Sequence, residues 1–119
     1  MKKTLFSFFI TIFCTIFIFN NIGFSAIINV PADKDLQAAL TTAQNNGEDD
    51  TIYIAAGTYV GNFHYVAAVG ENFSLTIIGA GASSTVLDGN NAGHVLRLKN
   101  EEGRDIFIQG LTVKKGNAN

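Results

Sequence analysis

Residues 75–89 read LTIIGAGASSTVLDG, two short runs of β-forming residues separated by a turn rich in Gly, Ala and Ser. The first run covers 75–78 and the second covers 85–87, and both consist of Leu, Ile, Val and Thr, the residue types of short buried strands. The intervening 79–84 segment is followed by neither the Lys nor the helix of a phosphate-binding loop. The stretch therefore predicts two strands joined by a tight turn.

Similar strand-sized pieces continue on both sides of this stretch. They are 52–54, 58–60, 95–98, 106–108 and 111–113, and an earlier apolar run, 27–30, ends at Pro31. Segments of helical length and periodicity do not alternate with these pieces, which argues against a βαβ sheet.

A weak repeat links the pieces. The dipeptide Gly-Asn occurs at 61–62, 89–90 and 116–117, so its successive copies are almost equally spaced. A period near 27 predicts a solenoid, in which parallel strands of successive coils lie about 4.8 Å apart. The side chains predicted to fill its narrow core are Ile52, Ile54, Ile77, Val86, Leu96, Ile106 and Ile108.

One amphipathic helix precedes the repeats, at 33–46. Its apolar stripe at i, i+3, i+4 and i+7 consists of Leu36, Ala39, Leu40 and Ala43. We predict Asp33 as its N-cap, Gly47 in a left-handed conformation after its end, and 48–50 (Glu-Asp-Asp) as a solvated turn. A helix with a single apolar stripe suits the task of covering the first coil and its strand edges.

These segments resemble the opening of the pectate-lyase-like right-handed parallel β-helix superfamily. The likeness is carried by TIYIAAGTY at 51–59, LTIIGAG at 75–81 and TVLDG at 85–89, and it covers about 27–117. It implies an all-β right-handed parallel β-helix with an N-terminal capping helix. Members usually have many coils and this chain has about three, so we predict a partial sequence.

The amino-terminal residues have the pattern of a secretory signal. Lys2 and Lys3 precede an apolar run, 5–19, and small residues lie at Gly23, Ser25 and Ala26. We predict a signal peptide at 1–25 and the cap with the first coils at 26–119; cleavage after Ala26 and an uncleaved membrane anchor are the alternatives. The run is shorter than the roughly 20 residues that span a bilayer, which favours cleavage over a stable anchor.

The predicted mature part is acidic and has no cysteine. It has six Lys and Arg residues against all ten acidic residues, a formal charge of −4. This balance argues against nucleic acid as the main partner, and the absence of cysteine excludes a disulfide-stapled small domain.

The acidic residues offer no assignable catalytic site. The resemblance implies Ca²⁺ held by clustered acids if the parent protein is a lyase, and facing Asp pairs if it is a hydrolase. We interpret Asp88 as a turn residue that binds its own backbone, and Glu101, Glu102 and Asp105 as a solvated loop with Arg104. Catalytic residues stay unknown, and neither a metal site nor a cofactor is predicted.

For the two histidines of the sequence we favour structural or surface roles over metal binding. His64 and His94 are separated by nearly one repeat of the sequence, so they are expected on adjacent coils. Two histidines alone do not make a metal site. Arg97, Lys99 and the pair at 114–115 are candidates to line a groove for acidic sugars.

Three functional interpretations follow. The first is a secreted or cell-surface module of the carbohydrate-binding or adhesin type. The second is the N-terminal part of a polysaccharide lyase or glycoside hydrolase acting on acidic polysaccharide, which rests on fold analogy alone. The third is a fragment without activity of its own. Whether the protein is an enzyme is left open.

Overall fold

The computed structural model describes residues 24–70, 72–100 and 104–117, so nearly all of the predicted signal peptide and Glu101, Glu102, Ala118 and Asn119 lie outside the described part. The described chain is mostly β, with one short helix. Its elements are β1 (Ser25–Val30), α2 (Leu36–Ala43), β2 (Asp49–Ile54), β3 (Gly57–Val60), β4 (Phe63–Val66), β5 (Leu75–Gly79), β6 (Thr85–Asp88), β7 (Leu96–Lys99), β8 (Ile106–Gln109) and β9 (Thr112–Lys114).

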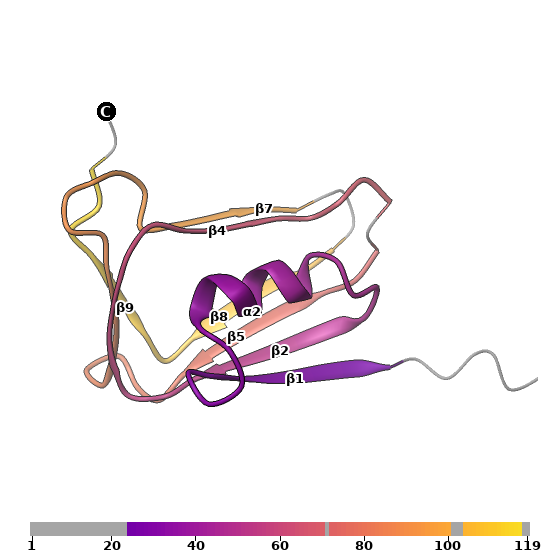
Figure 1. The fold of residues 1–119 in the computed structure, drawn as a ribbon, viewed down its shortest axis with the longest axis horizontal. Coiled ribbons are helices and arrows are strands. Elements are labelled where there is room, and N and C mark those ends of the chain that lie inside the picture. The colour runs from indigo at the N-terminus through magenta and orange to yellow at the C-terminus, as the bar shows by residue number, and fades with distance from the viewer. Residues whose placement is uncertain (1–23, 71, 101–103, 118–119) are drawn as a thin grey trace, which may run out of the picture.

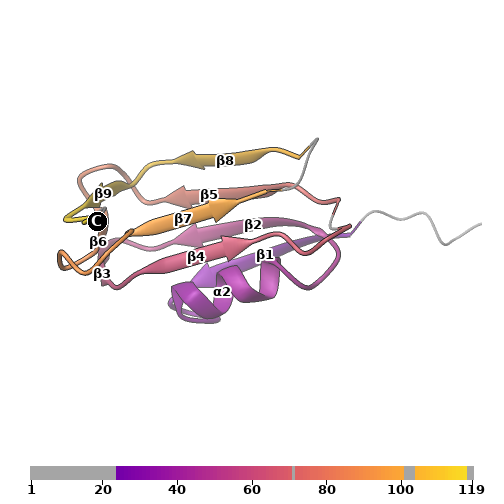
Figure 2. The same ribbon diagram turned by 90° about the horizontal axis from the view of Figure 1, so that it is seen from above.

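The strands form three parallel sheets. Sheet A has the order β1-β2-β5-β8, sheet B has β3-β6-β9 and sheet C has β4-β7. The chain visits sheets A, B and C in turn, and we call one such passage a rung: β2-β3-β4, then β5-β6-β7, then β8-β9. Figure 1 looks along the stack, and Figure 2 shows the rungs one above another.

The predicted ladder of strands is confirmed. Ile52 pairs with Ile77, and Ile77 with Ile108, all in parallel register. On sheet A, Asp50 pairs with Leu75 and Leu75 with Ile106, so the second step along the chain is longer than the first. The rungs therefore keep a common core but differ in the length of their turns.

The core runs along the inside of the three sheets. As predicted, Ile52, Ile54 and Ile77 are buried, with exposed fractions of 0–2%. Leu96 and Ile106 are partly buried and pack against this cluster. Ile108 is 39% exposed, contrary to the prediction, because β8 is the last strand of sheet A in the described chain and has a neighbour on one side.

Val86 was wrongly predicted to face the core. Thr85 and Leu87 are fully buried instead, and Val86 is only partly buried. The buried hydroxyl of Thr85 is satisfied: it donates to the carbonyls of Ile54 and Ala55, both at 3.2 Å, and accepts from the Ala80 N–H at 2.9 Å. A polar residue thus occupies an inward position that the hydrophobic pattern assigned to its neighbour.

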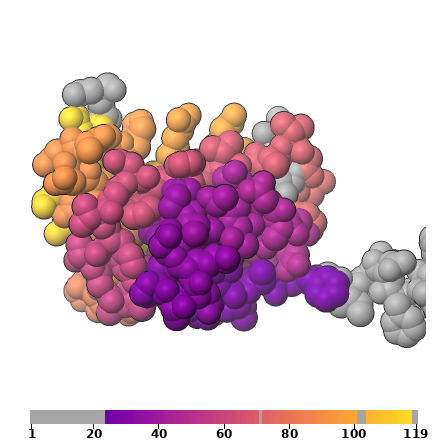
Figure 3. All heavy atoms as spheres, viewed as in Figure 1, coloured from indigo at the N-terminus to yellow at the C-terminus, as the bar shows by residue number. Residues whose placement is uncertain are grey.

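Helix α2 covers the first rung, as its apolar stripe predicts. Leu36, Ala39, Leu40 and Ala43 are all buried. The helix lies across the near end of the stack in Figure 1, and its indigo atoms cover that end in Figure 3. It contacts β1, β2 and β4 and so closes the end of the core.

The boundaries of α2 differ from the prediction. The N-cap is Asp35, whose Oδ1 accepts from the Ala38 N–H at 2.8 Å. Asp33 was the wrong choice because its Oδ2 accepts from both the backbone N–H and the Nδ2 of Asn29, at 2.8 and 3.0 Å. The helix ends at Ala43, and Gly47 has the expected positive φ of 71°, but it lies well beyond the C-cap Gln44.

Strand β4 was not predicted, and α2 completes its hydrogen bonding. The Gln37 side chain donates to the His64 carbonyl at 3.0 Å and accepts from the His64 N–H at 2.9 Å. Gln44 accepts from the Val66 N–H at 3.2 Å. The two glutamine side chains thus take the place of a neighbouring strand along the outer edge of β4.

The prediction of a solvated turn at 48–50 is only partly correct. Asp49 and Asp50 begin β2, and Asp50 is only 4% exposed because its register position, between Ala26 and Leu75, faces inward. Asn46 Nδ2 donates to Asp50 Oδ1 at 2.6 Å, and Asp49 Oδ1 accepts from the Ser74 N–H at 2.8 Å. Both carboxylates are therefore part of the sheet A end rather than a solvated loop.

Candidate functional site

Sheet C presents basic side chains on its outer face. His64 of β4 and Arg97 of β7 are register partners, as are Val66 and Lys99, and all four are exposed. Alternation along each strand places them on one face, because Tyr65 between His64 and Val66 is buried. Side chains from the orange β7 region stand out along the upper surface in Figure 3.

A shallow hollow of about 310 Å³ lies beside this face. Its lining includes Asn62, His64, His94 and Arg97. Asn62 Nδ2 donates to the His94 carbonyl at 2.8 Å, which ties the turn before β4 to the turn before β7. The prediction that the two histidines lie on adjacent coils is confirmed in this sense: they come from neighbouring rungs and line the same hollow.

A second hollow of about 390 Å³ adjoins the first and shares Gly93 and His94 with it. Lys114, Lys115 and Asn117 contribute to its lining. The Asn117 N–H donates to the Gly93 carbonyl at 2.8 Å. Of the cations nominated from the sequence for a groove, Arg97 lines the first hollow and the two lysines line the second, whereas Lys99 lines neither.

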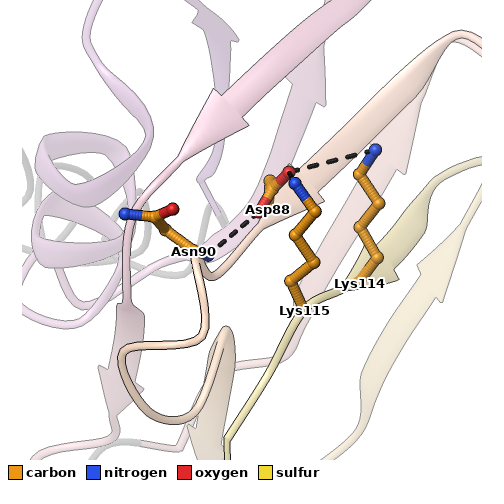
Figure 4. Close-up of polar contacts among 4 residues, drawn as sticks. All are labelled: Asp88, Asn90, Lys114 and Lys115. Carbon is orange, nitrogen blue, oxygen red and sulfur yellow. Dashed lines mark hydrogen bonds and ion pairs between the residues drawn. The ribbon is translucent and has the colours of Figure 1, made fainter.

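Asp88 engages both lysines of the second hollow. Its Oδ2 lies 3.1 Å from Lys115 Nζ and 3.9 Å from Lys114 Nζ, as Figure 4 shows. Its Oδ1 accepts from the Asn90 N–H at 2.9 Å, the backbone bond predicted for a turn residue. The ion pairs were missed because Asp88 and the lysines lie on successive rungs, remote from each other in the chain.

The two lysines converge because the backbone turns at Lys115. Successive residues of a strand point to opposite faces, so neighbouring lysines should diverge. Lys115 has φ of 54° and lies just beyond β9, where the left-handed conformation redirects its side chain. The hydrogen bonds between rungs identify the equivalent residue of the preceding rung. The Gly61 N–H donates to the Asp88 carbonyl, and one rung later the Gly89 N–H donates to the Lys114 carbonyl. Gly89, which follows Asp88, is therefore equivalent to Lys115, which follows Lys114.

The environment of Asp88 lowers the pKa of its carboxyl below the ordinary value of 3.8. The main cause is the hydrogen bond from the Asn90 N–H, followed by the contact with Lys115. A lowered folded-state pKa means that the stability contributed by the carboxylate is present well above pH 3.8. It is lost as the pH falls from there through the folded-state pKa.

We therefore expect Asp88→Asn to be less stable than the wild type at neutral pH, with the difference shrinking as the pH falls below 3.8. Urea unfolding of both proteins across this pH range measures it. In the Lys115→Met background, the loss of stability caused by Asp88→Asn at neutral pH should be smaller, because the nearer cation is absent. A difference between wild type and Asp88→Asn that is constant with pH would contradict the assignment.

The other candidate residues named from the sequence do not form a cluster in the structure. Asp105 is exposed just before β8, while Arg104 is partly buried rather than solvated. The 79–84 segment is the predicted turn, with the Ser84 N–H bonded to Gly81 O at 3.0 Å. Within the described ranges, groups of three or more His, Cys, Asp or Glu side chains suited to a metal ion are absent.

The helix of the described chain, α2, is too short to cross a bilayer, and those ranges contain no other candidate span. Comparisons of the chain with protein-family models, with curated proteins and with solved structures gave no match.

Proposed function

We propose that this chain is the N-terminal part of an exported right-handed parallel β-helix that binds acidic polysaccharide at the cell surface or outside the cell. The fold part of the proposal is supported by the repeating order in which the chain visits three parallel sheets. The resemblance of 51–59 and 75–89 to the pectate-lyase-like superfamily supports it independently. The Lys-Lys head, the apolar run and the small residues before Ile27 support export.

One observation supports the binding function above the others. His64, His94, Arg97 and Lys99, which we call the basic face, lie on or beside the outer surface of sheet C, and the described residues that line the two hollows include no acid. The predicted mature chain has an excess of acids, so the positive charge of Arg97 and Lys99 on this face is local. A local excess of positive potential attracts and orients anionic ligands.

The chemistry of the basic face suits carboxylated sugars. The Arg97 guanidinium can donate two parallel hydrogen bonds to a carboxylate, and Lys99 offers a point charge two positions further along the strand, about 6.6 Å away. The Asn62 side chain lies at the same hollow, where an amide suits sugar hydroxyls. Lys114 and Lys115 contribute less, since Asp88 partly neutralises them.

We expect Arg97→Ala to weaken binding of polygalacturonate by about tenfold, which corresponds to about 1.4 kcal/mol. Lys34→Ala, which removes an exposed cation before α2, is the matched control and should leave affinity unchanged. Titration calorimetry with polygalacturonate and with a neutral polysaccharide measures both. Equal loss in the two variants, or equal affinity for the neutral polymer, would reject the basic face as the site.

An absorbance measurement on the protein mixed with polygalacturonate distinguishes a binding module from a lyase. A lyase on this scaffold would release unsaturated uronides, which absorb in the ultraviolet, when polygalacturonate is supplied with Ca²⁺. Binding without such product supports the module. Product formation by the full-length parent would favour the enzymatic alternative.

A further inference from the structure

The predicted signal-peptidase cleavage site lies inside a strand of the folded protein. Cleavage after Ser25 breaks the bond to Ala26, and cleavage after Ala26 breaks the bond to Ile27. Both bonds fall within β1, Ser25–Val30. This placement holds whichever of the two positions the peptidase uses.

The strand is paired along its whole length with its neighbour. Ser25 is in register with Asp49, Ala26 with Asp50 and Ile27 with Thr51, and the ladder continues to Val30 and Ile54. Figure 2 shows β1 lying alongside β2 at the α2 end of the stack. The backbone on both sides of the scissile bond is therefore held in sheet A.

The side chains of β1 also anchor it. Ile28 and Val30 are buried, at 5% and 2% exposed, and Ala26 lies on the same inward side and is partly buried. A peptidase must seat an extended segment in its own active site, with side chains of both faces accessible. β1 is the outermost strand of sheet A in the described chain, but its inward side chains are committed to the core.

We infer that removal of the amino-terminal segment normally precedes the closure of sheet A, so that this chain is processed while unfolded and is matured only slowly once it has folded. The inference rests on the export part of the proposed function. It adds an order of events: cleavage first, then pairing of β1 with β2. A folded precursor would be cut only through the small fraction of molecules in which β1 has opened.

The test uses the full chain, including its head, in detergent micelles with purified signal peptidase. We expect the folded precursor to be cleaved at least about tenfold more slowly than the same chain diluted from urea. Ile52→Asp places a charge at a fully buried position on β2 and leaves the cleavage sequence intact, so it should restore fast cleavage. Tyr53→Asp, on the exposed side of the same strand, is the matched control and should be cleaved as slowly as the wild type.

A second variant is designed to keep the fold while releasing the scissile bond from sheet A. A Gly-Ser-Gly-Ser insertion after Ile27 leaves Ile28 and Val30 to anchor the rest of β1 and separates the cleavage sequence from the sheet. It should be cleaved rapidly while folded. Equal rates for the wild type, Ile52→Asp and the insertion would overturn the inference. An absence of cleavage in every form, including the chain from urea, would instead reject the signal-peptide proposal and the inference with it.

Discussion

Gly79→Ala should destabilise the protein by about 3 kcal/mol, the upper end of the cost of overpacking. A Cβ built on Gly79 would lie 2.2 Å from the carbonyl oxygen of Gly110 and 2.9 Å from Leu111 Cβ. Gly110 lies directly over this turn, because its carbonyl accepts from the Gly81 N–H at 2.8 Å. A methyl group at residue 79 therefore forces the second and third rungs apart.

Gly70→Ala is the matched control for this substitution. Gly70 has φ of +83°, but no atom lies within 4 Å of its added Cβ, so the expected cost is about 1 kcal/mol of backbone strain. Urea unfolding of the two variants, with the slopes compared, measures both costs. If Gly79→Ala cost no more than Gly70→Ala, the close stacking of the turns would be wrong.

Ile52→Ala should cost about 4 kcal/mol of unfolding free energy, because it leaves a cavity in a side-chain stack that cannot collapse around it. Ile52 is fully buried and lies in register between Ile28 and Ile77 on sheet A. Parallel strands on both sides fix the positions of its neighbours. A small domain with a total stability of about 5–15 kcal/mol would lose a large part of it.

Ile108→Ala provides the comparison within the same stack. Ile108 follows Ile77 in register but is 39% exposed, so its removal should cost about 1 kcal/mol. Chemical denaturation of the two alanine variants gives the difference directly. Similar costs at both positions would show that burial along the stack does not decrease toward β8.

In a short strand, the sequence pattern does not decide which side chains face the core. In the run 85–88, the alternation of side chains allows two assignments that differ by one position, and the apolar pattern favoured Val86 over Thr85 and Leu87. The hydrogen bonds of the Thr85 hydroxyl to the preceding rung explain why a polar residue is buried there. β4, with the sequence FHYV, was missed because its hydrogen-bonding partners, Gln37 on one side and β7 on the other, are remote in the chain.

The candidate site shows the same limit more strongly. His64 and His94 were expected on adjacent coils from their spacing, and this placement is confirmed. Nothing in the sequence indicated that Lys114 and Lys115 would both meet Asp88, because that depends on the left-handed backbone of Lys115 and on the register of sheet B. The burial of Asp50 likewise depends on its register with Ala26 and Leu75.

By itself, the sequence determined the local features, which are the short strands and the apolar stripe of α2, and its repeat near 27 residues predicted the parallel pairing of 52–54, 75–78 and 106–108. The local features follow from residue type and spacing over a few positions. The tertiary structure alone decided which side of 85–88 faces the core, which edge α2 completes and which charges meet. Those outcomes depend on hydrogen-bonded register between segments that lie a whole rung apart in the chain, which short-range patterns do not encode.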